Sequence, residues 1–416
     1  MEIAEVNIFK TEGHRVSVCH DLSSLSNADD STGQEYDISG LLETLGRVKD
    51  RRSRRGRIYG LAFLLAASLV AVLAGATNFR QISDQIADFP QSLLSKLGAK
   101  WCYFRSMFGW PSERTIRRVL ENVAADELDR AVGAWLHKNA RAEGEGELVL
   151  AIDGKVLRGA WTDENEKFTL FSAMIHGTGV TVAQVPVPAD TNEITQVEAL
   201  LEAVPVGAEA QVVVTMDAAH TQRDTAECLK GRRGFDYVMT VKGNQPSLLE
   251  SVFKTILPKL KNAPDHVVQE RGHGRINRWE TWTTDATGID FPHIRQAACI
   301  RRNVFTLDGT WLSKEHAWIA TSSDTATPAD LHTHVRQHWG IENKSHHVRD
   351  TTWREDAQQV YTGSGPRVMA TLRNMAASLL RLNGFTKIKE ATEWIARDRN
   401  RALPLLATQS NKRYRQ

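Results

Sequence analysis

The chain has 416 residues, of which 25% are charged and 41% are hydrophobic. This composition excludes a collagen-like chain, a wholly disordered chain and a small disulfide-stapled protein, and the length predicts two or three structural units. Because 52 Lys and Arg residues face 50 Asp and Glu residues, any affinity for nucleic acid must come from local basic patches.

The four cysteines lie far apart and form no CxxC pair, a pattern that disfavours both structural zinc and a disulfide framework. The first 50 residues contain no apolar stretch of the kind found in a secretory signal. We therefore expect a reducing, cytoplasmic environment.

Residues 1–46 carry nine acidic side chains and many small polar residues, which predicts a disordered, poorly packed lead-in. The charge then reverses, because Arg47 to Arg57 hold seven basic residues and one acid. Such a run favours contact with phosphates, and a solvated linker is the alternative. The side chains expected to make these contacts are Arg51, Arg52, Arg54 and Arg55.

An uncharged segment of 22 residues, Ile58 to Phe79, is long enough to span a bilayer. Six of its residues are alanine and two are glycine, which contribute little to membrane insertion, and amphipathic helical patterns follow it. The segment therefore also fits a buried helix. On this second interpretation, residues 47–141 form an all-α N-terminal unit.

From Glu147 the pattern changes to short apolar runs separated by turns, in the order β-β-β-α-β-α-β up to about residue 245. Runs such as VVVTM do not alternate, which is typical of strands covered on both faces. The prediction is a mixed α/β sheet flanked by helices, spanning residues 145–385. Short strands over 263–320 read as a β-rich insertion, and residues 386–416 as a helical extension with a basic tail.

Two aspartates stand at the ends of predicted strands, Asp153 in LAIDGK and Asp217 in VVTMDAAH. Open α/β sheets bind ligands at such ends, and clustered carboxylates suit Mg²⁺ or Mn²⁺. The candidates for a third acid are Glu342, Glu355 and Asp356. Helical spacing favours Glu342, which shares a face with residues three and seven positions earlier.

Three carboxylates with basic neighbours form the layout of a two-metal phosphoryl-transfer site. The acids expected to hold the two ions and to catalyse the reaction are Asp153, Asp217 and Glu342. The basic neighbours expected to contact a phosphate backbone are Lys155, Arg158, Lys242, Arg275 and Arg278. The last two flank a predicted hairpin tip whose glycines allow close approach.

The motifs DGKVLRG, FSAMIHGTG, TNEI, DAAHTQRDTAE, YVMTVKGNQ, GHGR, HWGIEN with HHVRDTTWREDA, and GPRVMATLRN occur in this order. Together they resemble the DDE transposases of bacterial insertion sequences, in the subgroup that includes the H-repeat-associated proteins. The resemblance covers most of residues 40–405. It implies a ribonuclease H-like fold in which Asp153, Asp217 and Glu342 match the DDE acids, interrupted by a β-rich insertion before the last acid.

In related transposases the glutamate helix also carries a tyrosine, an arginine and a lysine. Here Val335 and His338 stand at the first two positions, and Arg349 replaces the lysine. Asn244, His338 and Arg349 are further expected DNA contacts. Trp339, beside Glu342, is expected to stack on an extruded base, with core packing as the alternative. The apolar segment 58–79 is similar to the family's soluble helical associated domain, which argues against a membrane span.

These resemblances imply a cytoplasmic DNA transposase that binds terminal inverted repeats and performs metal-dependent strand cleavage and strand transfer. Its partners would be double-stranded DNA at the element ends and at the target, bound as a dimer or higher oligomer, with no membrane. Two alternatives remain at this stage: a catalytically inactive DNA-binding relic, and a structure-selective nuclease with the same fold.

Overall fold

The computed structural model describes residues 36–141, 146–161, 167–206, 211–360 and 362–407. Its largest element is a nine-stranded mixed sheet. In chain order the strands are β3 (Leu148–Trp161), β4 (Lys167–Ile175), β5 (Thr181–Val187), β6 (Val212–Met216), β7 (Asp236–Val241), β8 (His266–Gly272), β9 (Arg275–Asp285), β10 (Gln296–Thr306) and β11 (Trp311–Thr321). Across the sheet they run in the order β5-β4-β3-β6-β7-β11-β10-β9-β8.

Helices gather at both ends of the chain. The N-terminal ones are α2 (Ser39–Gly46), α3 (Leu61–Leu73), α4 (Phe79–Ala87), α5 (Gln91–Lys96), α6 (Glu113–Leu120) and α7 (Ala125–Ala140), with a small hairpin of β1 (Trp101–Cys102) and β2 (Met107–Phe108). Between the strands lie η3 (Glu193–Gln196), α8 (Val197–Ala203), α9 (Arg223–Ala226), η4 (Glu227–Arg232) and α10 (Pro246–Ile256). The C-terminal ones are α11 (Pro328–His338), η6 (Ile341–His346), α12 (His347–Trp353), η7 (Glu355–Ala357), α13 (Gly365–Leu382), α14 (Ile388–Arg397) and α15 (Leu403–Leu406).

The first half of the sheet follows the order that the sequence predicted. Strands β3, β4 and β5 form an antiparallel meander. Strand β6 lies between β3 and β7 and runs parallel to both. Every residue of β6 is buried, as expected for a central strand with helices on both faces. The mixed α/β architecture with flanking helices is therefore confirmed.

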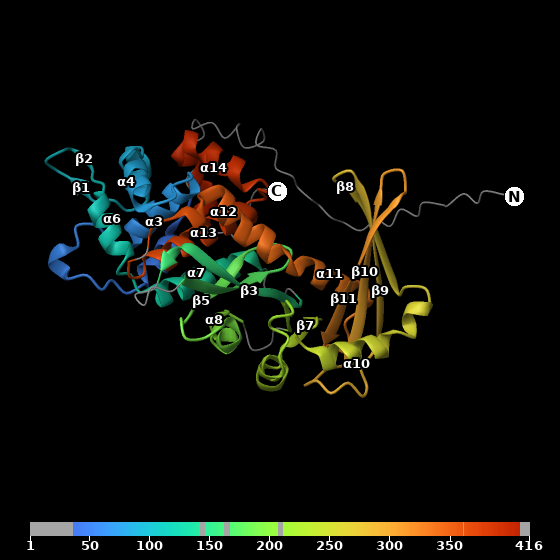
Figure 1. The fold of residues 1–416 in the computed structure, drawn as a ribbon. Coiled ribbons are helices and arrows are strands. Elements are labelled where there is room, and N and C mark those ends of the chain that lie inside the picture. The colour runs from blue at the N-terminus through green and yellow to red at the C-terminus, as the bar shows by residue number, and fades with distance from the viewer. Residues whose placement is uncertain (1–35, 142–145, 162–166, 207–210, 361, 408–416) are drawn as a thin grey trace.

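The strands of the 263–320 region extend this same sheet. Strand β11 pairs with β7 in antiparallel fashion from Trp318 to Thr321, and β10, β9 and β8 follow it outward. In Figure 1 these long strands project from the right of the molecule. At the tip, His273 and Gly274 both adopt positive φ, 51° and 73°, as a two-residue type I′ hairpin turn requires.

The uncharged segment 58–79 contains the buried helix α3, in which 12 of 13 residues are shielded from solvent. This helix packs against α2, α4 and α13. Among the residues that the structure describes, no helix is both long enough and apolar enough to cross a membrane. The apolar character of the segment is thus explained by its place in a helical core.

The two ends of the chain share one hydrophobic core. Helix α13, whose first 16 residues are all buried, packs against both α3 and α7, and α7 also packs against β5. Helix α2 contributes Leu41 and Leu45 to this core, so the predicted lead-in ends before residue 39. Residues 1–35, and the basic tail within 408–416, lie outside the described residues.

Candidate functional site

The register of the sheet brings the two predicted aspartates together. Strands β3 and β6 are parallel, and Ala151 pairs with Thr215. Asp153 and Asp217 each follow two residues later, so they sit side by side on the same face of neighbouring strands. Asp217 is fixed further because its Oδ1 accepts hydrogen bonds from the backbone N–H groups of Ala219 (3.0 Å) and His220 (3.3 Å).

The third predicted acid, Glu342, comes from a helix that lies across the sheet. Helix α11 begins with a capping box between Thr327 and Asp330 and with Pro328 in its first turn. It is followed by a π-helical turn, η6, a widened geometry that occurs often at functional sites. Ile341 in this turn packs on Ala151 and Met174. The neighbouring Glu342 is exposed, and its charge raises the pKa of Asp153.

Two further side chains belong to the same cluster and were not predicted as site residues. Ligand atoms of Asp153, Glu193 and His220 all lie within 4.8 Å of one another, a spacing that could hold a metal ion. Glu193 belongs to the TNEI motif at the start of η3, and His220 to the DAAH turn after β6. Both motifs were visible in the sequence, but their proximity to Asp153 depends on the tertiary fold.

The cluster is rich in negative charge. Burial raises the pKa of Asp153 to about 7 against the opposing hydrogen bond from Gly154, and the charges of Asp217, Glu193 and Glu342 raise it further. The nearest basic group is the His346 ring, whose Nδ1 lies 3.7 Å from Asp153 Oδ2. Burial, with the nearby Arg349 and Lys155, holds the His346 pKa well below its ordinary value, so this ring is neutral at pH 7.

This donor set fits a divalent cation. Asp153 is a partly buried carboxylate whose ionised form is opposed by three neighbouring acids, and a bound cation would supply the missing positive charge. Carboxylate oxygens are hard ligands, which favour Mg²⁺ or Mn²⁺ over metals that prefer sulfur or nitrogen. Asp153, Asp217, Glu193 and Glu342 are the side chains that could hold such ions.

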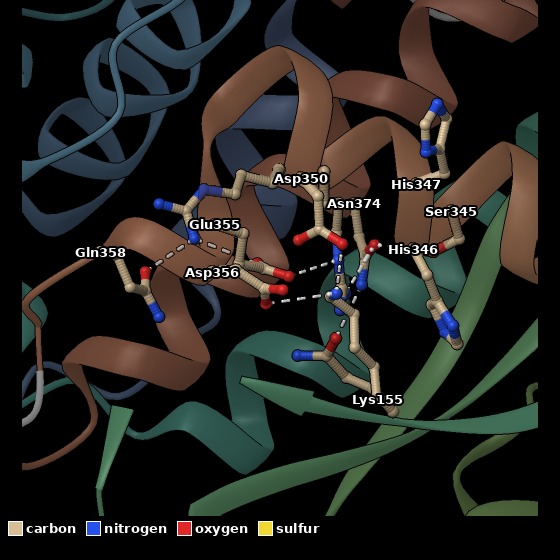
Figure 2. Close-up of polar contacts among 12 residues, drawn as sticks. Lys155, Ser345, His346, His347, Asp350, Glu355, Asp356, Gln358 and Asn374 are labelled. Atoms are coloured by element: carbon tan, nitrogen blue, oxygen red, sulfur yellow. Dashed lines mark hydrogen bonds and ion pairs between the residues drawn. The ribbon is translucent and has the colours of Figure 1, made fainter. Parts of the chain in front are cut away.

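Three residues expected to contact DNA face the protein interior. Lys155 donates a hydrogen bond to Asp350 Oδ2 (2.7 Å) and lies 3.6 Å from Asp356, and Figure 2 shows its side chain directed at these two acids. Arg349 is fully buried, and His338 is buried with its Nδ1 3.0 Å from Thr215 Oγ1. Lys155 and His338 thus connect the sheet to α12 and α11, and Arg349 connects α12 to η7 and α13 through Glu355 and Asn374.

The two other candidates for the third acid also have partners within the fold. Glu355 is 0% exposed, with Arg349 Nε 2.8 Å from Oε2 and Arg373 Nη1 donating to Oε1 over 3.0 Å. Asp356 Oδ1 lies 3.6 Å from Lys155 Nζ, a pair that Figure 2 shows. Its Oδ2 lies 3.5 Å from Arg158 Nε. Their charges are compensated by these cations, so among the three candidates for the third acid only the charge of Glu342 raises the pKa of Asp153.

The remaining predicted contacts lie at the surface. Arg51, Arg54, Arg55, Lys242 and Arg275 are exposed, and Trp339, beside the acid cluster in sequence, is 64% exposed. Four others are exposed or half-buried and take part in contacts within the chain: Arg52 with Asp50, Arg158 with Asp356, Arg278 with Glu280, and Asn244, which donates to the Ala218 carbonyl.

Comparison with known proteins agrees with this geometry. Residues 144–379 match the family described as the transposase DDE domain, and residues 42–136 match the family described as DDE_Tnp_1-associated. YncI of Escherichia coli O157:H7, by name a candidate transposase, is 27% identical over 83% of this chain and 88% of its own length. YhhI of Escherichia coli strain K12, by name an H repeat-associated candidate transposase, is 24% identical over 89% of this chain and 98% of its own length.

A cryo-EM structure of the piggyBac transposase synaptic complex with hairpin DNA overlaps 91% of this chain and 79% of its own chain. The sequence identity is 11% and the TM-score is 0.39. This degree of likeness fixes neither fold nor function.

Proposed function

The chain belongs to the transposase family defined by the DDE domain, and we propose that it cuts and joins DNA at the ends of an insertion sequence. The observation that carries this proposal is the convergence of Asp153, Asp217 and Glu342, which come from two adjacent strands and a later helix. The β-β-β-α-β-α-β order around the first two acids further supports a ribonuclease H-like catalytic fold.

In the proposed mechanism, Asp153, Asp217 and Glu342 hold two Mg²⁺ or Mn²⁺ ions. When bound, such ions activate an attacking oxygen and stabilise a leaving 3′ oxygen. The protein contributes position: the paired strands fix the two aspartates, and the packing of Ile341 fixes the turn that carries Glu342. Water would attack in the cleavage step, and the freed 3′ hydroxyl in the joining step.

The expected substrate is double-stranded DNA, first the terminal inverted repeats and then a target. Exposed Arg51, Arg54 and Arg55 would contact phosphates outside the cluster, and Trp339 would contact DNA next to it. Because two ends must be joined to one target, the working form would be a dimer or higher oligomer on DNA. We also propose a cytoplasmic location, where the DNA lies.

The test uses labelled duplex carrying the flanks of the gene, with Mg²⁺, Mn²⁺ or EDTA. Metal-dependent nicking that leaves a 3′ hydroxyl at the repeat boundary supports the proposal if Asp217→Ala abolishes the cut and retains binding. Asp224→Ala is the matched control, an exposed acid seven positions along the chain that should cut normally. Binding without cutting by the wild type indicates a relic, and cutting without joining indicates a nuclease.

A further inference from the structure

The TNEI motif has no role in the mechanism above, yet it lies at the metal-binding cluster. Asn192 caps the turn, because its Oδ1 accepts a hydrogen bond from the Ile194 N–H (3.1 Å). Thr195 Oγ1 donates back to the Asn192 carbonyl (2.8 Å), which closes the turn on itself. Helix α8 follows at once and is anchored in the core by Val197 and Leu200, so Glu193 begins a fixed element.

The glycine of the DGK motif shows how closely Glu193 approaches Asp153. A Cβ atom added to Gly154 would lie 1.7 Å from Glu193 Oε1 and 2.0 Å from its carboxyl carbon. The backbone at Gly154 is not in the left-handed region, so space is the reason for glycine here. The residue directly after Asp153 is therefore small because the Glu193 carboxylate occupies that position.

His220 holds this carboxylate in place. Its imidazole Nε2 lies 3.1 Å from Glu193 Oε2, its side chain is 2% exposed, and its ring stacks on Phe171 at a centroid distance of 5.0 Å. His220 is also tied to Asp217, whose Oδ1 accepts a hydrogen bond from the His220 N–H. One turn thus connects the second catalytic acid with the residue that orients Glu193.

We propose that Glu193 is a fourth acidic ligand of the metal site and that His220 is its positioning residue. This inference rests on the proposed function, since it adds a ligand to the same site. Ligand atoms of Asp153 and Glu193 lie within 4.8 Å of each other, a spacing at which one cation could contact both carboxylates. His220 already contacts Glu193 through Nε2, which assigns the ring to orientation of the carboxylate.

The first test measures Mn²⁺ affinity by calorimetry on the full chain without DNA. Glu193→Gln keeps the shape of the side chain and should weaken Mn²⁺ binding by about tenfold or more, as loss of a charged ligand does. Glu198→Gln is the matched control, because Glu198 lies five residues later and pairs with Arg232 at the surface. Its Mn²⁺ affinity should equal that of the wild type.

The second test separates orientation by His220 from general packing. His220→Phe keeps an aromatic ring against Phe171 but removes the nitrogen that contacts Glu193, and should weaken Mn²⁺ binding by roughly tenfold. His220→Gln restores a hydrogen-bond donor and should recover part of the affinity. Equal affinity of the Phe and Gln variants would remove the positioning role.

The outcomes separate this inference from the proposed function. If wild-type protein binds no Mn²⁺ and Asp153→Asn changes nothing, the proposed metal-dependent transposase fails first. If the wild type binds Mn²⁺ and Asp153→Asn does not, but Glu193→Gln binds like the wild type, then the metal site stands and the fourth ligand is wrong. A circular dichroism spectrum of each variant, matching that of the wild type, confirms that the comparison is between folded proteins.

An independent observation concerns the small hairpin of β1 and β2. Its tip carries Tyr103 and Phe104, which are 84% and 102% exposed, and its base is closed by an edge-to-face contact of Trp101 and Phe108 at 5.1 Å. In Figure 1 the hairpin projects from the helical side of the molecule, opposite the long strands. Two adjacent aromatic rings in solvent are costly unless they contact a partner.

The surroundings of this tip are basic. Exposed Arg105 lies at the tip itself, and its positive charge lowers the pKa of Tyr59 against the larger effect of burial. Tyr59 connects the hairpin to the basic loop of residues 47–57. Its hydroxyl donates a hydrogen bond to the Trp110 carbonyl, and its own carbonyl accepts one from Arg52. That loop also carries exposed Arg54. This charge suits a phosphate backbone, and we propose that the hairpin tip inserts its aromatic rings between base steps of duplex DNA.

The test compares two variants in DNA binding by anisotropy at several salt concentrations. Tyr103→Ser with Phe104→Ser should weaken binding at least fivefold with an unchanged salt slope, because stacking is worth about 1–3 kcal/mol per base. Arg54→Ala with Arg55→Ala should instead flatten the slope. Unchanged affinity of the aromatic variant, with a shift in its oligomeric state, would mean that the tip binds a second copy of the chain.

Discussion

Glu355 and Asp153 are both largely shielded from solvent, with side-chain exposures of 0% and 19%, and their surroundings differ in one respect. Glu355 is fully buried between the guanidinium groups of Arg349 and Arg373. Asp153 is mostly buried as well, but its charged neighbours include three acids. A buried acid that is paired with cations of the chain stabilises the fold. A buried acid that lies among other acids is suited to bind a metal cation.

The comparison matters because the sequence presents both acids alike. Glu355 in WREDA and Asp153 in LAIDGK each belong to a motif of the family, and each was a candidate for the metal site. What separates them is the balance of charge around each carboxylate, which only the tertiary structure reveals. Substitutions that change the charges around Glu355 or Asp153 test whether these two acids have different roles.

The largest change in the free energy of unfolding is expected when a cation that compensates the charge of Glu355 is removed. Arg373→Met leaves Glu355 with one of its two cations and removes a hydrogen bond to the Thr77 carbonyl. Breaking a buried ion pair costs about 3–5 kcal/mol, so the free energy of unfolding should fall by that amount in a denaturant titration. A loss under about 1 kcal/mol would contradict the structural role of this pair.

The opposite sign is expected at Asp153. Asp153→Asn removes a carboxylate that its neighbours oppose, so metal-free protein at pH 8 should become more stable, with Tm raised by roughly 2–4 °C for each kcal/mol. Thermal unfolding in EDTA measures this. The variant should also lose the rise in Tm that Mn²⁺ gives the wild type. A destabilised variant would mean that Asp153 is held by contacts that favour its charged form.

A smaller effect is expected from pH. The pKa of Asp153 is raised from its unfolded value of 3.8 to about 7, so the folded state binds the proton more tightly. Its contribution to stability is therefore present at pH 4 and falls as pH rises to 7. The Tm of wild-type protein relative to Asp153→Asn should drop between pH 5 and pH 8 in EDTA. A difference that does not change with pH would contradict the raised pKa.

The smallest effect is expected at an exposed pair. Arg232 donates to Glu198 over 2.8 Å, with both side chains about half exposed. Arg232→Met should change the free energy of unfolding by less than about 1 kcal/mol, because water screens and solvates such charges. A change as large as that of Arg373→Met would show that burial is not what separates the two pairs.

The sequence predicted the sheet because strands depend on local patterns, and its choice of Asp153, Asp217 and Glu342 as site acids stays a prediction. Apolar runs mark the strands, and the position of Asp217 at the end of such a run marks the sheet edge. Glu193 and His220 were missed because their meeting depends on η3 folding back over β3. The sequence also could not show that Lys155 and Arg349 point inward, since their partners Asp350 and Asn374 become neighbours only in the tertiary fold.

The long glutamate helix shows a second limit. Periodicity placed Glu342 on one continuous helical face, but the chain widens into a π-helical turn at Ile341. That turn alters which side chains face the sheet, and no local signal in HWGIEN marked it. The role of Glu342 stays a prediction, and the apolar Ile341 beside it binds the turn to β3 and β4.

The central claim is that the acids around Asp153 have no compensating cation among the residues that the structure describes because a divalent metal supplies the charge. Crystals grown with Mn²⁺ and measured at a wavelength where manganese scatters anomalously test this directly. The account predicts an anomalous peak in contact with an Asp153 carboxylate oxygen, at roughly 2.0–2.3 Å, with further oxygens from the other acids. Manganese bound elsewhere while these carboxylates are hydrogen bonded to one another would contradict it.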